Sequence, residues 1–389
     1  MGKLVIRTGR MSVLTGLIAS MILVISCSAD DIPTSTAEPL EPSFRIPFTP
    51  SIIYSNCCAP GSLCMEDFND DGFIDLAVSN TISANISVMF GNGEGGIGLN
   101  AKYRVGTYPA VIHGCDLDGN GIIDLVVSDR MSNSVFVLLG NEGGTFRAAV
   151  EHGVGREPRS LCSGDFNGDM NEDLVTANYD GNTVSILFGL GDGTFAPADS
   201  CLVGIRPISV CACDLDNDGS QDLCVVNELG HSVSILLGQG DGTFAEAVDY
   251  IAGIYPYSIH AADFDVDGNI DLAVFDRYDD TVTIYSGIGD GTVNDGVHFR
   301  SWRGPCTASS GDIDGDGYLD LVVANWNSDD LSVLLGDGTG RFSTSIYYKV
   351  GDGPLSVKCV DLDGDGDLDI VTANSLSDEI YVMLNETND

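Results

Sequence analysis

Positively charged residues are scarce in this sequence compared with acidic ones. Only 17 lysines and arginines stand against 58 aspartates and glutamates, which gives a formal net charge of −41. Nucleic acids and anionic lipid headgroups do not attract such a polyanion, so we expect neither as a partner. The chain nevertheless contains 43% hydrophobic residues and 48 glycines. That composition excludes a disordered polyanion and indicates a globular chain rich in turns.

Long hydrophobic runs are also rare, and the one of note covers residues 11–25. It follows Lys3, Arg7 and Arg10, and a basic start before a short apolar run predicts a secretory signal over residues 1–26 rather than a membrane span. The run ends in "VISC" (24–27), which resembles the lipobox of bacterial lipoproteins and implies lipidation of Cys27. We therefore expect an exported protein, anchored in the membrane at the cell surface or in the periplasm. Cleavage near Ala29, giving a secreted protein, is the alternative.

Residues 27–42 are rich in Pro, Ser, Thr and acidic side chains, which predicts a tether. Beyond it, an acidic motif, D-x-[DN]-x-[DN]-G-x-x-D, recurs at intervals of 49 residues. Its copies begin at Asp67, Asp116, Asp165, Asp214, Asp263, Asp312 and Asp361. A proline lies seven positions before each start. A period kept without insertion over seven copies predicts a repeat architecture.

Each repeat predicts four short strands, which we call A to D. Strand A is a segment such as "SVCAC" (209–213), and the β-branched run "DLVVAN" (320–325) is typical of strand B. The runs "LSVLLG" (331–336) and "RFSTSIYYKV" (341–350) are examples of strands C and D. Helical periodicity is absent. Four strands in a repeat of this length predict the blade of an all-β propeller.

The two ends of the chain predict how the ring closes. The last repeat stops at Asn385, after its strand C. Phe48 occupies the register position of Phe146 and Phe244, and Tyr54 that of Tyr103. Residues 46–54 are therefore expected to supply the missing outer strand of the last blade, which removes a free sheet edge. The prediction is a seven-bladed propeller of four-stranded antiparallel blades over residues 43–385, followed by a tail, 386–389.

The segments "GDFNGDMNEDLVTANYDGNTVSILFGLGDGTF" (164–195) and "CDLDNDGSQDLCVVNELGHSVSILLGQGDGTF" (213–244) resemble FG-GAP/VCBS repeats. Such repeats form the blades of integrin α-subunit heads and of many bacterial surface proteins. The resemblance covers residues 46–385. It implies the propeller fold strongly and the function weakly, since propellers include lectins, adhesins, scaffolds and enzymes.

The acidic motifs predict calcium sites, since a tight loop delivers the oxygen ligands of Ca²⁺ from alternate positions. A strand follows each loop, unlike the helix of an EF-hand. Up to seven ions are expected. The predicted side-chain ligands are Asp67, Asn69, Asp71 and Asp75; Asp116, Asp118, Asn120 and Asp124; Asp165, Asn167, Asp169 and Asp173; Asp214, Asp216, Asp218 and Asp222; Asp263, Asp265, Asp267 and Asp271; Asp312, Asp314, Asp316 and Asp320; and Asp361, Asp363, Asp365 and Asp369. The alternative is a set of solvated acidic turns, whose clustered carboxylates would repel one another.

The third site is expected to be the weakest. Asn69, Asn120 and Asn167 each replace an aspartate in the first three copies, which lowers the ligand charge. In the third copy Met170 also replaces the motif's glycine, at a position expected to need a positive φ. We expect the role of calcium to be structural, because the ion neutralises the loop and holds strands A and B together.

Blade topology sends the A–B and C–D loops to one face of the disc and the B–C and D–A loops to the other. The second face, here the B–C face, is predicted to be rich in arginine and aromatic residues, as recognition surfaces are. The candidate ligand-face residues are Tyr108, Arg130, Arg156, Tyr179, Arg206, Tyr255, Arg277, Tyr278, Trp302, Arg303 and Trp326. In integrin-like propellers this face carries the ligand site, which the resemblance implies here. The alternative is that these aromatic side chains merely cover the blade tops.

A further set of side chains lies on strand A, three residues before each acidic loop: Cys64, His113, Cys162, Cys211, His260, Ser309 and Lys358. Since innermost strands line the channel, the thiols and imidazoles could bind zinc or copper. We favour the alternative that small or adaptable side chains fit where seven strands crowd the axis. The chain has 12 cysteines, and Cys162–Cys211 and Cys57–Cys58 are candidate disulfide or ring-closing positions.

Enzyme signatures are missing. None of the five histidines lies in a nucleophile, zinc-protease or phosphate-loop motif. The aspartates follow the repeat, so choosing two as an acid–base pair would be arbitrary. We expect a monomeric, non-catalytic binding module for a carbohydrate or a surface protein, which meets the membrane only through its lipid anchor. A surface scaffold without a ligand is the main alternative, and a polysaccharide-acting lyase or hydrolase is a weaker one.

Overall fold

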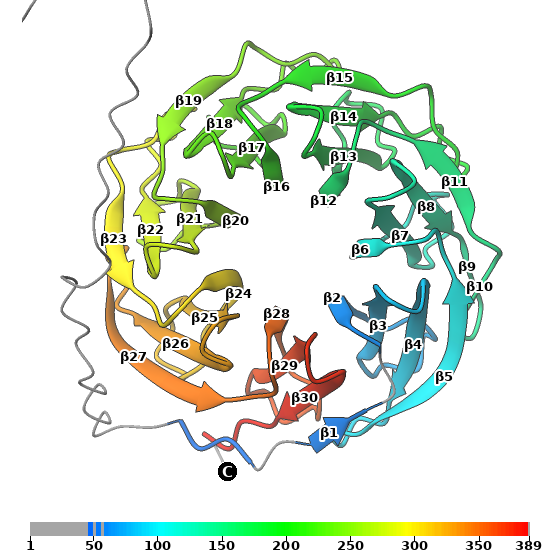
Figure 1. Cartoon of the computed structure of the whole chain (residues 1–389), viewed down its shortest axis with the longest axis vertical. Helices are drawn as coiled ribbons and strands as arrows, with labels where there is room; N and C mark the ends of the chain where they lie inside the picture. The colour runs from blue at the N-terminus through cyan, green and yellow to red at the C-terminus, as the bar shows by residue number, and fades with distance from the viewer. Residues whose placement is uncertain (1–45, 50–51, 56–57, 388–389) are drawn as a thin grey trace, which may run out of the picture. The chain divides into compact units, whose positions relative to one another are not determined.

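The computed structural model describes residues 46–49, 52–55 and 58–387, and every regular element within them is a β-strand (Figure 1). These residues belong to one compact unit, Pro42–Asp389. Seven four-stranded antiparallel sheets follow one another around a ring, which confirms the predicted propeller. No helix in the described part of the chain is long and apolar enough to cross a membrane. The predicted signal segment, Cys27 and the tether lie outside the described residues.

The first four blades follow one another along the chain. Blade 1 contains β2 (Pro60–Glu66), β3 (Asp75–Asn80), β4 (Asn85–Gly91) and β5 (Ile97–Arg104). Blade 2 contains β6 (Pro109–Cys115), β7 (Asp124–Asp129), β8 (Ser134–Leu138) and β11 (Val150–Gly153), with a small hairpin of β9 (Gly140–Asn141) and β10 (Thr145–Phe146). Blade 3 contains β12 (Pro158–Gly164), β13 (Asp173–Asn178), β14 (Thr183–Leu187) and β15 (Asp199–Leu202). Blade 4 contains β16 (Pro207–Cys213), β17 (Asp222–Asn227), β18 (Ser232–Leu236) and β19 (Val248–Ile251).

The last three blades complete the ring. Blade 5 contains β20 (Pro256–Ala262), β21 (Asp271–Asp276), β22 (Thr281–Tyr285) and β23 (Val297–Arg300). Blade 6 contains β24 (Pro305–Gly311), β25 (Asp320–Asn325), β26 (Asp330–Gly336) and β27 (Phe342–Lys349). Blade 7 contains β28 (Pro354–Val360), β29 (Asp369–Asn374) and β30 (Glu379–Met383), and its outer strand is β1 (Ile52–Tyr54).

The N-terminal strand closes the ring as the sequence predicts. Strand β1 pairs antiparallel with β30, and Ile53 lies opposite Tyr381. A bridge between Phe48 and Asn385 continues this pairing. The first and last parts of the propeller therefore share one sheet, and blade 7 has no missing outer strand.

The core lies between neighbouring blades rather than within one. All six residues of each strand B are buried, as in β17 and β25, because blades pack against both sides of these strands. One cluster, for example, joins Val175 and Ile186 of blade 3 with Val210 and Val225 of blade 4. This explains why the strand B sequences are continuous β-branched runs instead of alternating polar and apolar residues.

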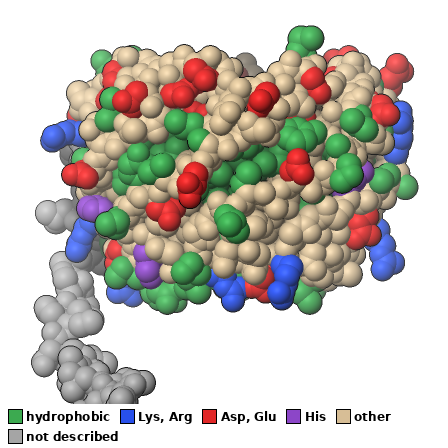
Figure 2. Space-filling model, turned by 90° about the horizontal axis from the view of Figure 1, so that it is seen from above, with side chains coloured by type: hydrophobic (Ala, Val, Ile, Leu, Met, Phe, Trp, Pro, Cys, Tyr) green, Lys and Arg blue, Asp and Glu red, His purple; other side chains and the backbone are tan. Residues whose placement is uncertain are grey.

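Hydrogen bonds between blades define the two faces. On the face of the acidic loops, a C–D loop glycine donates to the preceding blade's A–B loop, as Gly242 N does to Phe166 O at 3.0 Å. On the B–C face, a B–C turn residue with positive φ accepts from the next D–A loop, as Asn182 Oδ1 does from Arg206 N at 2.9 Å. In the edge-on view of Figure 2, many acidic side chains lie on the upper surface, and most of the visible Lys and Arg lie toward the lower rim. The two faces thus differ in charge.

Candidate functional site

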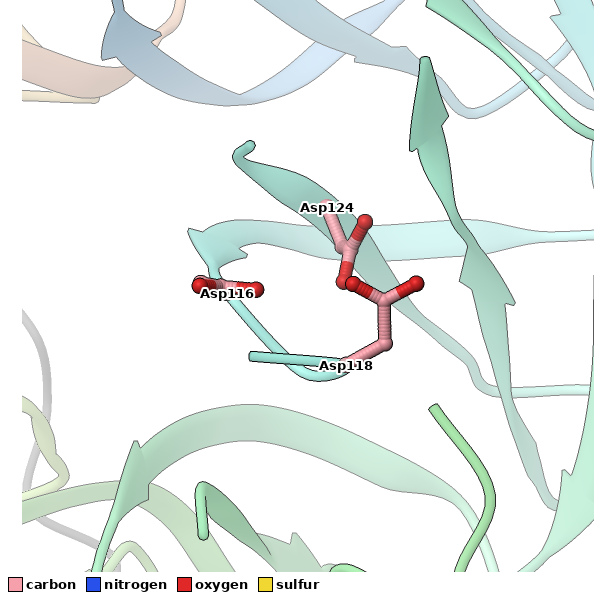
Figure 3. A group of neighbouring side chains, drawn as sticks. All are labelled: Asp116, Asp118 and Asp124. Carbon is pink, nitrogen blue, oxygen red and sulfur yellow. The ribbon is translucent and has the colours of Figure 1, made fainter. Parts of the chain in front are cut away.

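The acidic loops bring carboxylates together in five of the blades. In each, three carboxylate groups have oxygen atoms within 4.8 Å of one another. The groups are Asp116, Asp118 and Asp124; Asp214, Asp216 and Asp218; Asp263, Asp265 and Asp271; Asp312, Asp314 and Asp316; and Asp361, Asp363 and Asp365. Figure 3 shows how Asp116, Asp118 and Asp124 surround one point at the end of the blade 2 loop. These clusters could hold a metal ion.

The first and last aspartates of each motif also fix the loop backbone. In blade 6, Asp312 accepts hydrogen bonds from the backbone N–H groups of Asp316 and Gly317, at 3.0 and 2.9 Å. The buried Asp320 accepts from Ile313 N at 2.9 Å and from Gly336 N at 2.8 Å, which ties the loop to the end of strand C. Each carboxylate oxygen that accepts one hydrogen bond has a second lone pair left for a cation.

The buried carboxylates at the end of the loops are costly to ionise without a cation. Burial raises the pKa of Asp320 to about 7; hydrogen bonds from Gly336 and Ile313 oppose this rise, and the charges of Asp314 and Asp316 add to it. The pKa rises to about 6, again mainly through burial, at Asp75, Asp173, Asp222, Asp271 and Asp369. A nearby positive charge favours the ionised form. A cation in the loop would therefore remove this cost.

The environment of two side-chain oxygen atoms shows whether the loops are suited to a cation. Asn69 Oδ1 and Asp118 Oδ1 are buried and accept no hydrogen bond from any described residue. Both belong to the second ligand position of their motifs. Buried polar atoms are normally satisfied, and oxygen atoms are the ligands that a hard divalent cation prefers. The donor set therefore fits such an ion in blades 1 and 2, although blade 1 has asparagine at this position.

The loop of blade 3 differs from most of the others in the orientation of its second ligand position. Asn167 Nδ2 donates to Asp169 Oδ2 at 3.2 Å, so the second ligand position is turned toward its own loop. Asp165 Oδ1 accepts from Gly168 N at 2.7 Å, a contact that Asp361 and Gly364 repeat in blade 7, as well as from Asp169 N at 3.2 Å. Met170 has a φ of 67° and is 91% exposed. This loop satisfies its polar groups internally and, like the loop of blade 1, lacks a group of three adjacent carboxylates.

Backbone strain is not confined to that loop. Val266, at the fourth motif position of blade 5, has a φ of 58°. Left-handed backbone is a genuine outlier for a β-branched residue. The repeat motif leaves this position free and so did not predict its backbone, whereas Gly315 and Gly364 occupy it in blades 6 and 7, with φ values of 77° and 81°.

On the B–C face, one register position displays a side chain in every blade. It is the residue directly after strand B, whose backbone N–H donates to a carbonyl of the D–A loop at 2.9–3.3 Å. The residues at this position are Thr81, Arg130, Tyr179, Glu228, Arg277, Trp326 and Ser375. Because the same backbone hydrogen bond recurs in all seven blades, these residues occupy equivalent positions on the B–C face around the ring of blades. We call this set the mouth ring.

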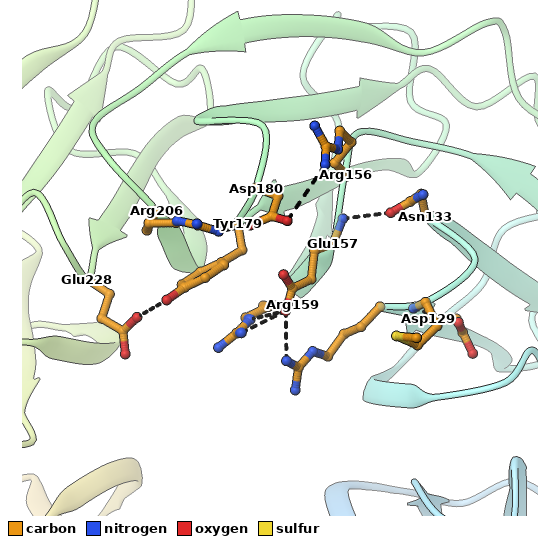
Figure 4. A network of polar contacts seen from close by, with 11 residues as sticks. Asp129, Asn133, Arg156, Glu157, Arg159, Tyr179, Asp180, Arg206 and Glu228 are labelled. Carbon is orange, nitrogen blue, oxygen red and sulfur yellow. Dashed lines mark hydrogen bonds and ion pairs between the residues drawn. The ribbon is translucent and has the colours of Figure 1, made fainter.

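Blades 2 to 4 contribute a network of paired charges to this face (Figure 4). Glu157 Oε1 accepts from Arg130 and Arg159 at 2.7 Å each. Burial raises the pKa of Glu157, but hydrogen bonds from both guanidinium groups outweigh it and lower the pKa. The guanidinium of Arg159 lies 3.6 Å from the centre of the Tyr179 ring. These side chains therefore hold one another in place.

The network continues toward blade 4. Arg206 forms an ion pair with Asp180, and its guanidinium lies 4.8 Å from the Tyr179 ring centre. The Tyr179 hydroxyl donates to Glu228, the neighbouring member of the mouth ring. With Arg156, which also lies near Asp180, the network combines four arginines with three carboxylates, so it presents both hydrogen-bond donors and acceptors beside an aromatic ring.

A second cluster lies on blades 5 and 6. The guanidinium of Arg277 is 4.8 Å from the Tyr257 ring centre and 5.5 Å from that of Trp326. Tyr257 and Arg159 were not among the residues predicted from the sequence. Both follow directly after the repeat's proline, Pro256 and Pro158, and this shared register position was the signal that could have found them.

The remaining ligand-face candidates are dispersed. Tyr108 lies beneath the guanidinium of Arg130 at 5.2 Å. Tyr255 packs against Tyr278 in a tilted arrangement with ring centres 4.7 Å apart. Trp302 packs on Tyr347 of the outer strand β27, at 5.0 Å. The side-chain contacts of two further candidates are limited: Arg156 lies 3.9 Å from Asp180 and Arg303 is exposed.

The side chains near the channel do not form a thiol–imidazole metal site within the described residues. His113 and His260 instead contact serines of the next blade, Ser163 at 3.1 Å and Ser310 at 2.8 Å. Burial, with a contribution from the charge of Lys358, lowers the pKa of both imidazoles to about 4. At these two positions strand A therefore contributes to the contacts between blades.

A cavity of about 180 Å³ lies at blades 7, 1 and 2, with Cys64, Glu66, His113 and Lys358 in its wall. All ten cysteines in the described part of the chain are free. The Cys162–Cys211 bridge is therefore wrong: each of these side chains packs in a different inter-blade cluster. Cys57 lies outside the described residues.

Comparison with known protein families matches residues 116–176, 165–225, 214–274 and 312–372 to the FG-GAP-like repeat. The matched stretches cover more than half of the chain. It belongs to the FG-GAP-like repeat family. The acidic loops of this FG-GAP-like repeat chain contain the Asp clusters described above, which could bind metal ions. No curated protein matches the chain.

Solved structures with the same fold carry different activities. An Agrocybe aegerita lectin, described as recognising non-reducing terminal N-acetylglucosamine, is 20% identical with a TM-score of 0.54, over 73% of this chain and 79% of that one. Virginiamycin B lyase from Staphylococcus aureus is 13% identical with a TM-score of 0.59, over 87% and 99%. A periplasmic gluconolactonase from Pseudomonas aeruginosa is 18% identical with a TM-score of 0.57, over 76% and 86%. At sequence identities this low, the similarity to these structures shows a common fold alone.

Proposed function

We propose that this FG-GAP repeat protein is a calcium-stabilised binding module that takes a carbohydrate or a partner protein on its B–C face. The observation that carries the proposal is the mouth ring, which places Arg130, Tyr179, Arg277 and Trp326 at one register position. Arginine and aromatic side chains are enriched at binding hot spots. The mixture of guanidinium groups, carboxylates and aromatic rings suits a ligand with both polar and apolar surface.

Calcium is the ion we propose for the acidic loops. The donors are carboxylate and amide oxygens, supplemented by loop carbonyls, and they come from alternate positions of a tight turn. When bound, the ion would supply positive charge to carboxylates such as Asp312, Asp314 and Asp316. Those residues would hold it while their hydrogen bonds fix the loop between strands A and B. The role is structural, on the face away from the mouth ring.

We further propose export and membrane anchoring through Cys27, with binding rather than catalysis as the activity. The support is the N-terminal pattern of basic residues, a short apolar run and "VISC". A bound surface ligand would then keep the propeller close to the cell envelope or connect it to a neighbouring structure.

A glycan array and surface-protein pull-downs test the proposed function. The calcium-loaded chain is compared with an Arg206→Ala/Trp326→Ala double variant on the B–C face. The matched control is an Arg147→Ala/Arg341→Ala double variant, whose changes lie in the C–D loops of the acidic face. Binding lost only in the first variant would support the proposal. Binding equal in all three proteins would place the site elsewhere, and silence in both assays would favour a scaffold.

A further inference from the structure

We propose that Arg277 is the anchor of an anion subsite that binds the carboxylate of a uronic acid residue in a saccharide ligand. This inference rests on the proposed function, because it names the ligand class for the B–C face. It arises from a comparison of Arg277 with Arg130, its counterpart in the mouth ring. The two arginines are related by three repeat lengths, but their surroundings differ in one decisive residue.

Arg130 has a built-in carboxylate partner. Glu157, the residue before the proline of blade 3, accepts from its guanidinium at 2.7 Å. The corresponding residue before the proline of blade 6 is Gly304. Both positions have positive φ, 57° at Glu157 and 72° at Gly304, so the local backbone is alike. The repeat thus places Arg277 where a carboxylate would complete an ion pair, and supplies none.

Arg277 is half-buried and has no carboxylate within ion-pair distance among the described residues. Its side-chain contacts are the faces of Tyr257 and Trp326. A partly buried charge without a partner is unfavourable, and removal from water makes it a stronger receptor for an anion. The aromatic rings hold the guanidinium without using its hydrogen-bond donors.

Further positive charge acts at the same place. Burial raises the pKa of the Tyr257 hydroxyl, while the charges of Arg277, Arg159 and Arg130 act in the opposite direction. Three arginines therefore act on the surroundings of Tyr257, and of these Arg277 is the one that no carboxylate neutralises within the described residues, although the chain as a whole carries −41. A ligand with one negative group is attracted here, whereas a polyanion is repelled by the rest of the surface.

The neutral groups beside Arg277 favour a sugar acid over an acidic peptide. The Tyr257 hydroxyl and the side-chain amide of Asn327 form no hydrogen bonds within the described part of the chain. Asn327 is exposed and lies against Gly304, since a Cβ at Gly304 would stand 2.5 Å from Asn327 Nδ2. Hydroxyl and amide groups both donate and accept, as sugar hydroxyls require. The Trp326 ring adds an apolar surface at the edge of the subsite.

Calorimetric titration of the calcium-loaded full chain with glucuronate- and galacturonate-ended oligosaccharides tests the inference. The neutral probes are the same oligosaccharides ended by glucose or galactose. We expect uronate-ended probes to bind at least roughly tenfold more tightly, the ratio expected for a charge-assisted hydrogen bond. Arg277→Gln should remove this preference, whereas Arg341→Gln on the acidic face should retain it. The melting temperature of each variant checks its fold.

A second variant tests the inference while Arg277 is kept: it adds a carboxylate beside Arg277 instead of removing the arginine. Gly304→Glu should supply the carboxylate that Glu157 provides to Arg130, and so block uronate binding while Arg277 is still present. Gly304→Gln, of equal size, should block it less.

Three results would overturn the inference. Equal affinity for uronates and neutral sugars would do so and leave the proposed function intact, as would a uronate preference that survives Arg277→Gln. Binding of an acidic peptide through Arg277 without uronate binding would replace the saccharide by a protein ligand. Absence of binding in both the titrations and the pull-downs would remove the proposed function itself.

Discussion

The backbone N–H of Ala59 donates to Oδ1 of Asp378 at 2.7 Å, across 319 residues of the chain. The same hydrogen bond joins Asp329 with Gly353 and Asp280 with Gly304, each at 2.9 Å, between blades that are adjacent in sequence. The final junction of the ring, from blade 7 to blade 1, therefore uses the contact that links the internal blades. Ring closure depends on this clasp as well as on strand β1.

Loss of the closing clasp should destabilise the propeller. Asp378→Ala removes the acceptor for Ala59 N, and we expect the free energy of unfolding to fall by about 1 kcal/mol. Asp378→Asn is the matched control, because Asn133 and Asn182 make the same contact with an amide oxygen. Urea unfolding in calcium measures both. Equal stability of the alanine variant and the parent chain would show that β1 alone closes the ring.

Removal of calcium should lower the melting temperature by several degrees or more. An ion bound by the folded state and not by the unfolded chain adds stability according to its free concentration. Asn69 Oδ1 and Asp118 Oδ1, buried without partners, mark two sites where this contribution is expected. Differential scanning calorimetry with added calcium and with a strong chelator makes the comparison. An unchanged melting temperature would contradict calcium binding by the loops.

The calcium-dependent part of stability should differ between loops. Asp312→Ala or Asp361→Ala should reduce the difference in unfolding free energy between calcium and chelator more than Asp165→Ala does. The reason is that Asn167 already donates to Asp169 in the third loop. Equal reductions would show that the third loop binds calcium as well as the others do.

Strain in that third loop gives an independent test. Met170→Gly relieves a left-handed backbone at a φ of 67°, and we expect a gain of about 0.5–1 kcal/mol in the free energy of unfolding. Leu190→Gly, at an exposed C–D loop residue outside the positive-φ set, is the control and should not stabilise the chain. A loss of stability in Met170→Gly would mean that the methionine contributes a contact worth more than the strain.

The period of the sequence predicted the architecture because each repeat is one structural unit. A constant spacing of 49 residues placed every blade, and the positions of Phe48 and Tyr54 in that register identified the closing strand. The same register predicted which loops carry the carboxylates. These features depend on local sequence and on repetition, which a single chain displays in full.

Contacts between blades could not be predicted in the same way. That Glu157 binds both Arg130 and Arg159, whereas Arg277 meets only aromatic rings, depends on side chains from adjacent blades meeting around the channel mouth. The Cys162–Cys211 bridge was wrong for a related reason, since equal register positions in neighbouring blades face different inter-blade clusters. Residues at the same position of the repeat have the same backbone conformation. The contact partner of each side chain, however, depends on which residues the neighbouring blade supplies.

Asp276 offers a pH-dependent test of a buried polar contact within blade 5. Five other blades have asparagine at this buried position, for example Asn227 and Asn325. Burial raises the pKa of Asp276 to about 6, and hydrogen bonds from Thr283 and Thr281 only partly oppose that effect. A raised carboxyl pKa means that ionisation costs stability. The contribution of Asp276 is therefore complete below its unfolded pKa near 4 and lost as the pH rises through about 6.

Asp276→Asn should remove this loss. Relative to the parent chain, the variant should gain on the order of 2 kcal/mol in unfolding free energy between pH 4 and pH 7. The calcium loops titrate alike in both proteins, so the difference isolates Asp276. Asp129→Asn should show the opposite trend, because backbone N–H groups of Ser132, Tyr108 and Thr107 outweigh burial and lower the pKa of Asp129. Urea unfolding at constant calcium across this pH range measures both variants, and a stability difference for Asp276→Asn that does not change with pH would mean that Asp276 ionises in the folded chain as readily as in the unfolded one.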